Sequence, residues 1–580
     1  MSASHVPDLK VHLQKLFEAA LDEVAPECAI AIAFERPKQS SHGDYACNLA
    51  LQLAKHLGRN PRELAQELQR SLPVSALVEK TEIAGAGFIN VFLKPAAKQS
   101  VVGRIFSTAQ AYGTSKAGNG RTVQVEFVSS NPTGPLHVGH GRGAAIGASI
   151  ANLLACAGYD VQREYYVNDA GRQMDILALS AWLRYLELGG IAAPFPGNAY
   201  QGDYVRSMAA EIRAAHGTRY DRDALSVAGN AAATESDSEA YLDTLIGNAK
   251  RLLGEDYAYI HQLVLTEQIG DCRHDLMQFG VHYDCWFSEQ SLFDSGMVAR
   301  VITRLNEAGH LYRQDGALWF RSSAFGDEKD RVVQRENGEF TYFASDIAYH
   351  CNKFERGFDS IVDLWGADHH GYIPRIKAAL SALGLDAEKL HVPLVQFVVL
   401  YRNGIKIPMS TRAGEFVTLR ELRNEVGNDA ARFFFVLRKS DQHLDFDLEL
   451  AKSQSNDNPV FYVQYAHARI CSVLEKWGGD AADLADADSS ALTSPHELDL
   501  LQALIDYPEV MADAAREYAP HSVAHYLREL ASKLHSYYNA EQFLVQDERI
   551  KLARLALIAS TRQVLRNGLE VLGVGAPQQM

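Results

Sequence analysis

Apolar and polar residues alternate around residue 125, and this period of two predicts a β-strand. Val123, Val125 and Phe127 lie on one side of that strand, and a loop rich in Ser, Asn, Pro and Gly follows it. A helix of small and apolar residues, AAIGASIANLLACAG, comes next. Strand, glycine-containing loop and helix in this order are an arrangement that holds phosphate at a helix N-terminus.

The first 115 residues have the pattern of a small α/β domain. Asn60, Pro61 and Glu63 mark a helix start, with an Asn N-cap, Pro at the first helical position and Glu at the third. Residues 115–120, SKAGNG, form a predicted loop and a candidate domain boundary. The predicted elements are a helix at 8–24, a strand at 29–34, two helices within 41–68, and either a strand pair or one bent strand at 82–93.

Strands and helices alternate again after residue 315, which implies a mostly parallel sheet with ligands at the strand carboxyl ends. From about 190 to 280 a loop and several helices interrupt this alternation, and long amphipathic helices begin near 445. Residues 226–238 are predicted to form a surface loop. The predicted strands of this half are 317–322, 340–345, the start of SIVDLWGADHH, and 392–400, with a helix at 347–356.

The composition is typical of a globular protein of several domains. The chain has 580 residues, of which 47% are hydrophobic and 22% charged, an ordinary globular composition with room for about four domains. Its longest apolar stretch, at 392–401, is too short to span a bilayer, and the N-terminus has no secretory pattern. Seven cysteines without any CxxC predict reduced thiols, a cytoplasmic location and no structural zinc.

The net charge of −16 bears on the partner. Taken alone, this charge argues against nucleic acid, which calls for a basic footprint. Net charge does not fix local patches, however, so a nucleic-acid partner remains open. An acidic pocket would suit a small cationic substrate.

The loop after the first strand ends in His137-Val138-Gly139-His140. Two histidines three residues apart at a helix start can both reach a polyphosphate, and imidazolium N–H groups there would stabilise developing negative charge. Three small residues, Gly139, Gly141 and Gly143, allow a nucleotide to approach the backbone closely. This HVGH motif resembles the HIGH signature of class I aminoacyl-tRNA synthetases. The stretch VEFVSSNPTGPLHVGHGRGAAIGASIANLL is similar to arginyl-tRNA synthetases in particular, as are YYVNDAG and the closing LEVLGVGAPQQM.

The resemblance covers nearly the whole chain and implies an α/β fold with three domains. A Rossmann-like catalytic domain is expected at 116–445, with an insertion at about 170–300. A small α/β domain at 1–115 would precede it and contact the tRNA elbow. An all-α helical bundle at 446–580 would bind the anticodon. Aromatic and basic side chains are interleaved in that last part, as base stacking requires: Tyr462, Tyr465, His467, Arg469, Tyr526, Arg528, Tyr537 and Tyr538.

The ATP site implied by the resemblance lies on the HVGH loop and on LWGADHH. His137 and His140 would bind the phosphates, Gly139 would lie under the adenine, and Asp368 could take a ribose hydroxyl or an amino group. The expected ATP-binding residues are Pro135, His137, Gly139, His140, Gly366, Asp368 and Met409.

The second class I signature is a KMSKS loop, and its matching place here is IKIPMSTRAGEF. Met409 and Ser410 are present, but Pro408 and Thr411 stand where the two lysines would be. Because those lysines usually hold the pyrophosphate, another cation has to replace them.

Lys406 and Arg412 flank the gap and are the expected replacements, since either long side chain can reach a phosphate. Mg²⁺ and Arg142 are the next candidates. The expected catalytic residues are therefore His137, His140, Lys406, Ser410 and Arg412.

Arginine needs a carboxylate for its guanidinium and an acceptor for its ammonium. By the resemblance, Glu126 and Asn131 would hold the ammonium end. Tyr342 and Asp346 would form the guanidinium site, with an aromatic face or hydroxyl and a charge. The whole expected substrate set is Glu126, Ser129, Asn131, Tyr342, Asp346 and His369.

The reaction implied by the resemblance is ligation of L-arginine to tRNA(Arg) in two steps. The arginine carboxylate attacks the α-phosphorus of ATP, with Mg²⁺ bridging phosphates, and the adenylate then passes to the terminal adenosine of the tRNA. A cytoplasmic monomer that uses no membrane is expected. Two alternatives stay open, a tRNA- or arginine-binding paralogue without activation and a class I synthetase for another amino acid. The acidic pair Glu126 and Asp346 argues against apolar substrates.

Overall fold

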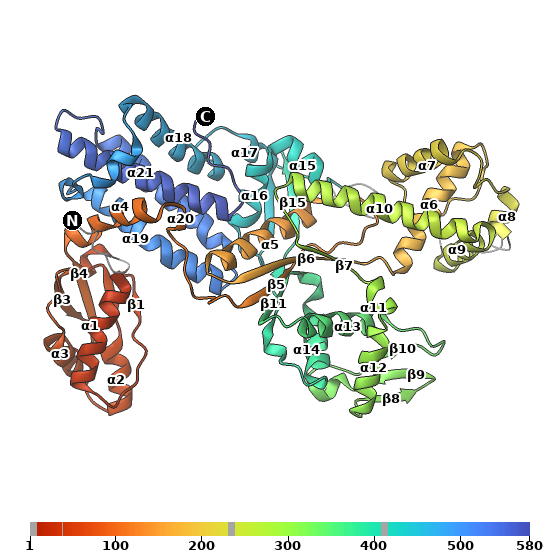
Figure 1. The fold of residues 1–580 in the computed structure, drawn as a ribbon, viewed down its shortest axis with the longest axis horizontal. Coiled ribbons are helices and arrows are strands. Elements are labelled where there is room, and N and C mark those ends of the chain that lie inside the picture. Colours follow the sequence, from red (N-terminus) through yellow and green to blue (C-terminus); the bar gives the residue numbers. More distant parts are fainter. Residues whose placement is uncertain (1–8, 38, 230–237, 408–415) are drawn as a thin grey trace.

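The computed structural model describes residues 9–37, 39–229, 238–407 and 416–580 (Figure 1). A five-stranded parallel sheet lies at the centre. The small N-terminal unit and a helical lobe lie at opposite ends of the molecule in Figure 1, and the C-terminal helices pack beside the sheet. The sheet shares one large hydrophobic core with the C-terminal helices. Three further lobes each have a hydrophobic core of their own.

The N-terminal unit is an antiparallel four-stranded sheet covered by helices, in the order β1-β2-β4-β3. The predicted cap is present, because the Asn60 side chain accepts a hydrogen bond from the backbone N–H of Arg62 at 2.9 Å. The predicted strand at 29–34 is wrong over most of its length, since only Phe34–Glu35 is extended and paired. The elements are α1 Leu9–Val24, β1 Phe34–Glu35, β2 Tyr45–Cys47, α2 Leu49–Leu57, α3 Pro61–Ser71, β3 Val78–Ala84 and β4 Phe88–Leu93.

Helix α4, Pro95–Thr108, connects this unit to the rest of the molecule. Its first turn belongs to the N-terminal core through Ala97, whereas Val101 and Ile105 pack in the large core with the C-terminal helices. The connection is thus a rigid helix rather than a loop.

The central sheet has the order β13-β11-β5-β6-β7 with every neighbour parallel. Helix α5 packs against β5 so closely that a Cβ on Gly147 would lie 2.2 Å from the Phe127 ring, so only glycine fits there. The predicted strand and helix around the HVGH loop are confirmed. The bounds are β5 Thr122–Glu126, α5 Val138–Cys156, β6 Asp160–Val167, β7 Cys285–Ser288, β11 Ser360–Asp363 and β13 Leu390–His391.

A helical lobe is inserted between β6 and β7 and has a core of its own (Figure 1). Its last helix, α10, is long and leads back to the sheet. The elements are α6 Arg172–Leu188, α7 Asp203–His216, α8 Ala224–Ala228, α9 Glu239–Leu253 and α10 Glu255–Gln278.

A second lobe, formed by the chain between β7 and β11 and by α14 after β11, combines helices with a three-stranded antiparallel sheet. The predicted strand at 340–345 is wrong, because Phe340 makes only an isolated bridge and a helix begins at Tyr342. Phe343 and Ile347 are buried four residues apart, a helical spacing that the short alternation FTYFAS had masked. The elements are α11 Gln290–Asp294, α12 Met297–Glu307, β8 Leu311–Gln314, β9 Ala317–Phe320, β10 Arg331–Gln334, α13 Tyr342–Glu355 and α14 Ile373–Ala382.

The predicted strand at 392–400 is divided in two by the chain around Gln396. One piece pairs with β12 and the other with β16 and β17. These short strands connect the central sheet to the C-terminal helices. Their bounds are β12 Trp365–Gly366, β14 Leu394–Val395, β15 Val398–Arg402, β16 Ile405–Lys406 and β17 Leu444–Asp447.

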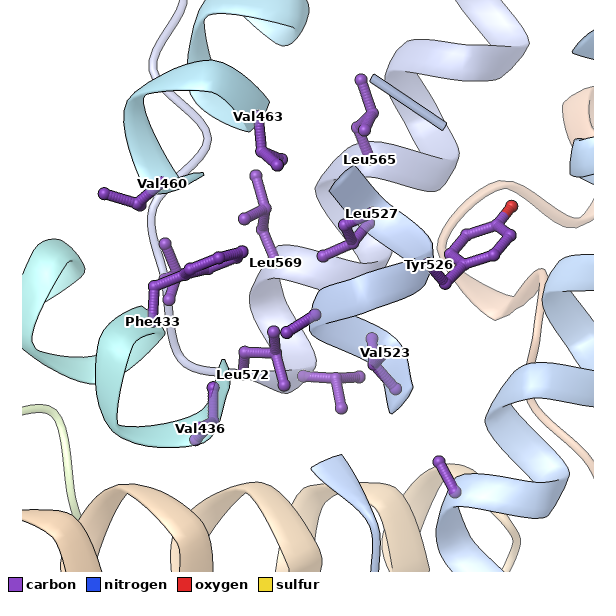
Figure 2. Close-up of a cluster of buried hydrophobic side chains, with 14 of the residues drawn as sticks. Phe433, Val436, Val460, Val463, Val523, Tyr526, Leu527, Leu565, Leu569 and Leu572 are labelled. Carbon is purple, nitrogen blue, oxygen red and sulfur yellow. The ribbon is translucent and has the colours of Figure 1, made fainter. Parts of the chain in front are cut away.

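The C-terminal part is a bundle of helices whose apolar side chains form one cluster (Figure 2). Phe433, Leu527 and Leu569 meet there from three different helices. No helix in the described ranges is long and apolar enough to cross a membrane. The helices are α15 Leu419–Val426, α16 Asn428–Leu437, α17 Leu448–Lys452, α18 Pro459–Trp477, α19 Pro495–Arg516, α20 Pro520–Ala540 and α21 Glu548–Val571.

Candidate active site

The two histidines of the HVGH loop cap helix α5. His137 Nδ1 accepts the backbone N–H groups of Gly139 at 3.0 Å and His140 at 3.3 Å. His140 Nδ1 accepts the backbone N–H of His137 at 3.3 Å, so the pair forms a reciprocal capping box. The rings stack with their centroids 3.6 Å apart. This geometry fixes both rings at the start of the helix.

Burial and the geometry of the cap favour neutral rings in this pair over the expected imidazolium groups. Burial lowers the pKa of His137, and it lowers the pKa of His140 well below its ordinary value. A ring nitrogen that accepts a backbone N–H carries no proton, so the remaining proton of each ring lies on Nε2. Each histidine can offer one neutral Nε2–H donor to a ligand at the helix N-terminus.

The glycines of this loop have different roles. A Cβ on Gly139 would lie 2.9 Å from the His137 ring, so this glycine allows the histidine to fold back over the helix start. Gly141 faces Leu419 and Phe435 in the core and leaves no room for a nucleotide. A Cβ on Gly143 would meet nothing within 4 Å, so the expectation of a close backbone approach stays with Gly139 and Gly143. Pro135 lies half-buried just before the cap.

Backbone pairing joins the HVGH loop to the segment that follows residue 415. Val138 N–H donates to the Val417 carbonyl at 3.2 Å, and Leu419 N–H donates to the Leu136 carbonyl at 2.7 Å. The other end of that region is Lys406, an exposed residue of β16. Lys406 is therefore the last expected catalytic residue of this region that the structure describes, whereas Met409, Ser410 and Arg412 lie outside the described residues.

Arg142 is excluded as a phosphate ligand. Its side chain is fully buried, and its guanidinium donates to the carbonyls of Gln396, Lys439 and Gln442 at 2.7 to 3.0 Å. The charge therefore holds three loop carbonyls beneath α5. Sequence spacing placed Arg142 near the histidines but gave no information about the direction of its side chain.

Three carboxylates lie side by side across the central sheet. Asp363, Glu126 and Glu164 are register partners on β11, β5 and β6, so their side chains share one face. Asp363 and Glu164 are fully buried, and Glu126 alone keeps a small exposed fraction of 8%. Such a row of buried charges is stable only with counter-charges in contact.

Helix α13 supplies those counter-charges. Lys353 Nζ lies 2.5 Å from Glu126 and 2.6 Å from Asp363, and Arg356 donates twice to Glu164 at 2.5 and 2.8 Å. Two side chains complete the network. The Tyr349 hydroxyl lies 2.8 Å from Glu126 and 2.7 Å from Glu164, so its one proton can go to either carboxylate, and His350 lies 3.1 Å from Asp363.

The charge balance of the row leaves Glu126 available. Lys353 and Arg356 supply two positive charges to three carboxylates, of which Glu126 is the one with surface left. Burial raises the pKa of Glu126, and the negative charge of Asp363 adds to this effect. A cationic group arriving at Glu126 would offset that cost.

The chain turns sharply directly after Glu126. Val128 and Ser129 have φ values of 69° and 40°, and Ser129 N–H donates to the Phe127 carbonyl at 3.0 Å. Positive φ at a β-branched residue is a strained conformation that concentrates at ligand sites. Ser129 Oγ accepts the backbone N–H of Tyr166 at 3.0 Å, so the hydroxyl helps to hold the turn, and Asn131 is exposed just beyond it.

The first turns of α13 carry the expected guanidinium site. Tyr342 and Asp346 are four residues apart and therefore share one face of the helix. Tyr342 is 54% exposed. The hydroxyl of Tyr372 donates to the Asp346 carboxylate, and burial raises the pKa of Asp346. Asp346 is neither a helix cap nor ion-paired within the described ranges, so its charge is free to meet a cation.

Glu289 is a second buried carboxylate at this site and was not predicted from the sequence. It accepts from the hydroxyl of Ser345, the neighbour of Asp346, at 2.8 Å. Its other oxygen and the hydroxyl of Tyr166 are buried without a hydrogen-bond partner in the described part of the chain. Burial raises the pKa of Tyr166, and the charges of Glu289, Asp346 and Glu126 raise it further. The Tyr166 side chain therefore lies near all three carboxylates.

A signal for Glu289 was present in the sequence. It follows directly after β7, at the carboxyl edge of the parallel sheet where ligands bind. Lys353 also had a signal, since it continues the helical face of α13 at the spacing of Tyr349. The residues that Glu289 and Lys353 contact cannot be predicted from sequence, because most of them lie far away along the chain.

The rim of the site is exposed. Asp368 and His369 follow Gly366 on a short 3₁₀ turn, and His369 Nε2 lies 3.6 Å from the Asp368 carboxylate. Burial raises the pKa of Asp346, and the nearby His369 offsets a small part of that rise. A Cβ on Gly366 would lie 2.5 Å from Asp368, so glycine lets this carboxylate fold back over the strand end.

The described residues were also compared with the requirements of a metal site. Within the ranges that the structure describes, no group of three or more His, Cys, Asp or Glu side chains has an arrangement that could hold a metal ion.

Three family models match this chain. "Arginyl tRNA synthetase N terminal domain" matches residues 11–93, "tRNA synthetases class I (R), catalytic domain" matches 101–188 and 256–448, and "DALR anticodon binding domain" matches 463–580. An arginine–tRNA ligase of Nitrosospira multiformis is 65% identical over 575 residues, covering 99% of each chain. Another of Nitrosomonas eutropha is 63% identical over the full length of both. The arginyl-tRNA synthetase of Thermus thermophilus has a similar structure, with a TM-score of 0.75 and 25% identity over 99% of this chain and 100% of that one.

Proposed function

Because the chain belongs to the arginyl-tRNA synthetase family, we propose how its own residues perform the arginine–tRNA ligase reaction. The chain combines an N-terminal domain, a class I catalytic domain and a helical anticodon-binding domain. The observation that carries the proposal is the group of buried carboxylates around Tyr166, beside the histidine-capped helix. An amino acid with two cationic groups fits that group.

We assign the tRNA contacts to the two ends of the chain. Residues 1–115 would contact the tRNA elbow, 116–445 would perform the chemistry with an insertion at about 170–300, and 446–580 would bind the anticodon. Of the aromatic residues in the last part, Tyr526 and Tyr537 are buried, while Arg469 stacks over Tyr538 with its guanidinium 3.7 Å from the ring centroid. Tyr465, Arg469 and Tyr538 form a half-buried stack that is suited to unpaired bases.

The arginine would lie with its two cationic ends at the two acidic places. Glu126 and Asn131 would take the ammonium group, next to the strained turn at Ser129. Asp346 and Glu289 would take the guanidinium, with Tyr342 on its exposed side. Two carboxylates fit a guanidinium fork that has five donors. A lysine ammonium has no such fork, so the pair favours arginine.

The first step needs positioning and charge neutralisation. The arginine carboxylate is already ionised at neutral pH and attacks the α-phosphorus of ATP, with pyrophosphate leaving. The Nε2–H groups of His137 and His140 would donate to the phosphates at the helix N-terminus, where negative charge is favoured. Asp368 would bind the nucleoside across the rim. Mg²⁺ would arrive bound to the ATP phosphates, because the described residues offer it no cluster of ligands.

The rate of arginyl-adenylate formation should not fall as the pH is lowered through 6.5. Burial favours the neutral rings, so the folded pKa values of His137 and His140 lie below 6.5. Their cap is fully formed above 6.5 and is lost only as the pH falls through the lowered values, when Nδ1 gains a proton. Single-turnover rates across the acidic range measure this. An ascending limb centred near 6.5 that disappears in His140→Asn would contradict the neutral pair.

The residues that replace the missing lysines are also part of the proposal. Lys406 and Arg412 would hold the pyrophosphate, with Arg412 favoured because its fork binds two oxygens at once. Arg412→Ala should slow adenylate formation by about tenfold to a thousandfold. Thr411→Lys should be tolerated because it restores the usual charge. Parental single-turnover rates in both Arg412→Ala and Lys406→Ala would show that the cation comes from elsewhere.

In the second step the terminal adenosine of tRNA(Arg) attacks the activated carboxyl group and AMP leaves. In class I synthetases the 2′-hydroxyl is the nucleophile. We further propose that the enzyme works as a cytoplasmic monomer and without a membrane.

Pyrophosphate exchange with each standard amino acid, with and without bulk tRNA, tests this function. We expect exchange with arginine alone, and only when tRNA is present. Exchange with a different amino acid would identify another class I specificity. Binding of arginine and tRNA without any exchange would identify a paralogue that has lost activation, the alternative suggested by the unusual loop at Pro408 and Thr411.

A further inference from the structure

A pocket of about 600 Å³ lies in the C-terminal bundle, far along the chain from the residues assigned to catalysis. It is bounded by α18, by the last turns of α21 and by the segment 573–578 that follows α21. Its volume is in the range of small-molecule and nucleotide sites.

The wall formed by segment 573–578 is fixed in place before any ligand arrives. Side chains of α16 and α18 bind its backbone at both ends, so the pocket is preformed. The hydrogen bonds are Arg432 Nε to Leu572 O at 3.0 Å, Gly575 N to Asp429 Oδ1 at 3.0 Å, Gln464 Nε2 to Gly575 O at 2.9 Å, and His467 Nδ1 to Pro577 O at 2.8 Å.

The pocket has an excess of positive charge. Arg562 and Arg566 are one helical turn apart on α21, and neither has an ion pair or hydrogen bond within the described ranges. The one carboxylate in the lining, Glu570, accepts two hydrogen bonds from Gln110. His467 forms the inner wall; burial is the main cause of its lowered pKa, and the two arginine charges add to it.

Other arginines on the same helix are paired with carboxylates, so the unpaired positive charge is confined to the pocket. Arg549 lies 2.6 Å from Asp488, and Arg554 lies 2.9 Å from Glu497 and 2.7 Å from Glu541. Two arginines held close together without a carboxylate repel each other, and an anion between them removes that cost. The chain as a whole carries a net charge of −16, so this local excess runs against its average.

We propose that this pocket binds a backbone phosphate of the tRNA anticodon arm. The proposal rests on the ligase function and on the match of residues 463–580 to the anticodon-binding family. Arg562 and Arg566 would grip the phosphate oxygens with their guanidinium forks. Contacts of this kind fix the register of the nucleic acid and carry no base information.

The test measures the affinity of the full-length enzyme for tRNA(Arg) as a function of salt. Arg566→Gln and Arg562→Gln should each weaken binding about tenfold, and each should lower the slope of log affinity against log salt by about 0.7 to 0.9. The rate at saturating tRNA should stay within about twofold of the parent, because a positioning contact of this kind is made before chemistry.

Arg549→Gln is the matched control, since it removes the same charge from the same helix at an ion-paired position. Arg566 is exposed, so its replacement leaves the fold intact, and thermal unfolding of each variant checks this. Parental tRNA affinity and salt slope in Arg562→Gln/Arg566→Gln would overturn the proposal, as would an equal loss in Arg549→Gln.

A second arm distinguishes RNA from a free anion. Inorganic phosphate is titrated against the parent and the double variant, with thermal stability as the readout. Stabilisation at millimolar phosphate that depends on the two arginines, together with unchanged tRNA binding, would identify a free-anion site and overturn the proposal. Failure of the ligase function itself looks different, because the parent would then not arginylate tRNA at all.

Discussion

Asp346→Asn should raise the KM for arginine by about 30- to 1,000-fold while the KM for ATP stays within about twofold. A charge-assisted hydrogen bond lost in a partly buried site costs about 2 to 4 kcal/mol, which gives that range. Asp346 is held by Tyr372 and has no ion pair in the described part of the chain, so the substrate guanidinium is its counter-charge. Steady-state arginylation at varied arginine measures the effect.

Glu355→Gln is the control for this prediction. Glu355 ends the same helix, and it pairs with Arg300 and Arg304 on the surface instead of facing the pocket. Its replacement should leave the arginine KM unchanged within about twofold, as expected of an exposed ion pair. An arginine KM within about threefold of the parent in Asp346→Asn would show that Asp346 is not the guanidinium partner.

Lys353→Met should lower the free energy of unfolding by about 3 to 5 kcal/mol, the cost of removing one partner from a buried ion pair. The substitution leaves Glu126 and Asp363 adjacent, buried and without their shared cation. Urea unfolding, followed by tryptophan fluorescence, measures the shift. Adenylate formation should also fall, because Glu126 would take up a proton and lose its attraction for the ammonium group.

A second substitution makes this prediction sharper. Lys353→Met combined with Asp363→Asn removes one of the two orphaned charges, so the double variant should be more stable than Lys353→Met alone. Non-additivity of this sign is the mark of residues in direct contact. A single variant within about 1 kcal/mol of the parent would mean that water reaches the carboxylates and that the row is not sealed.

Much of the scaffold of the site could be predicted from sequence. The period of two at Val123 to Phe127 and the small residues after His140 locate β5 and α5, because each pattern extends over several turns or pleats. The short alternation at 340–345 led to a wrong strand prediction, because a pattern of six residues fits a strand and a helix equally well. Only the burial of Phe343 and Ile347 identifies the helix.

The charge states and the directions of side chains at the site could not be predicted from the sequence. His140 next to phosphate suggests imidazolium, but burial and a shared capping box make the ring neutral. Arg142 is two residues from His140, yet it points into the protein and binds three carbonyls. Glu289 joins the pocket only through the parallel packing of β7 beside β6, more than a hundred residues apart along the chain.

The row of Asp363, Glu126 and Glu164 has a consequence for how this protein can diverge. Lys353 contacts two members of the row and Arg356 the third, so losing either cation leaves a buried carboxylate without a partner. Single substitutions in this set are therefore selected against, whatever their effect on the substrate. We expect the five positions to change together or not at all. A lineage that gives up arginine would still inherit the row, as a structural record of the ancestral pocket.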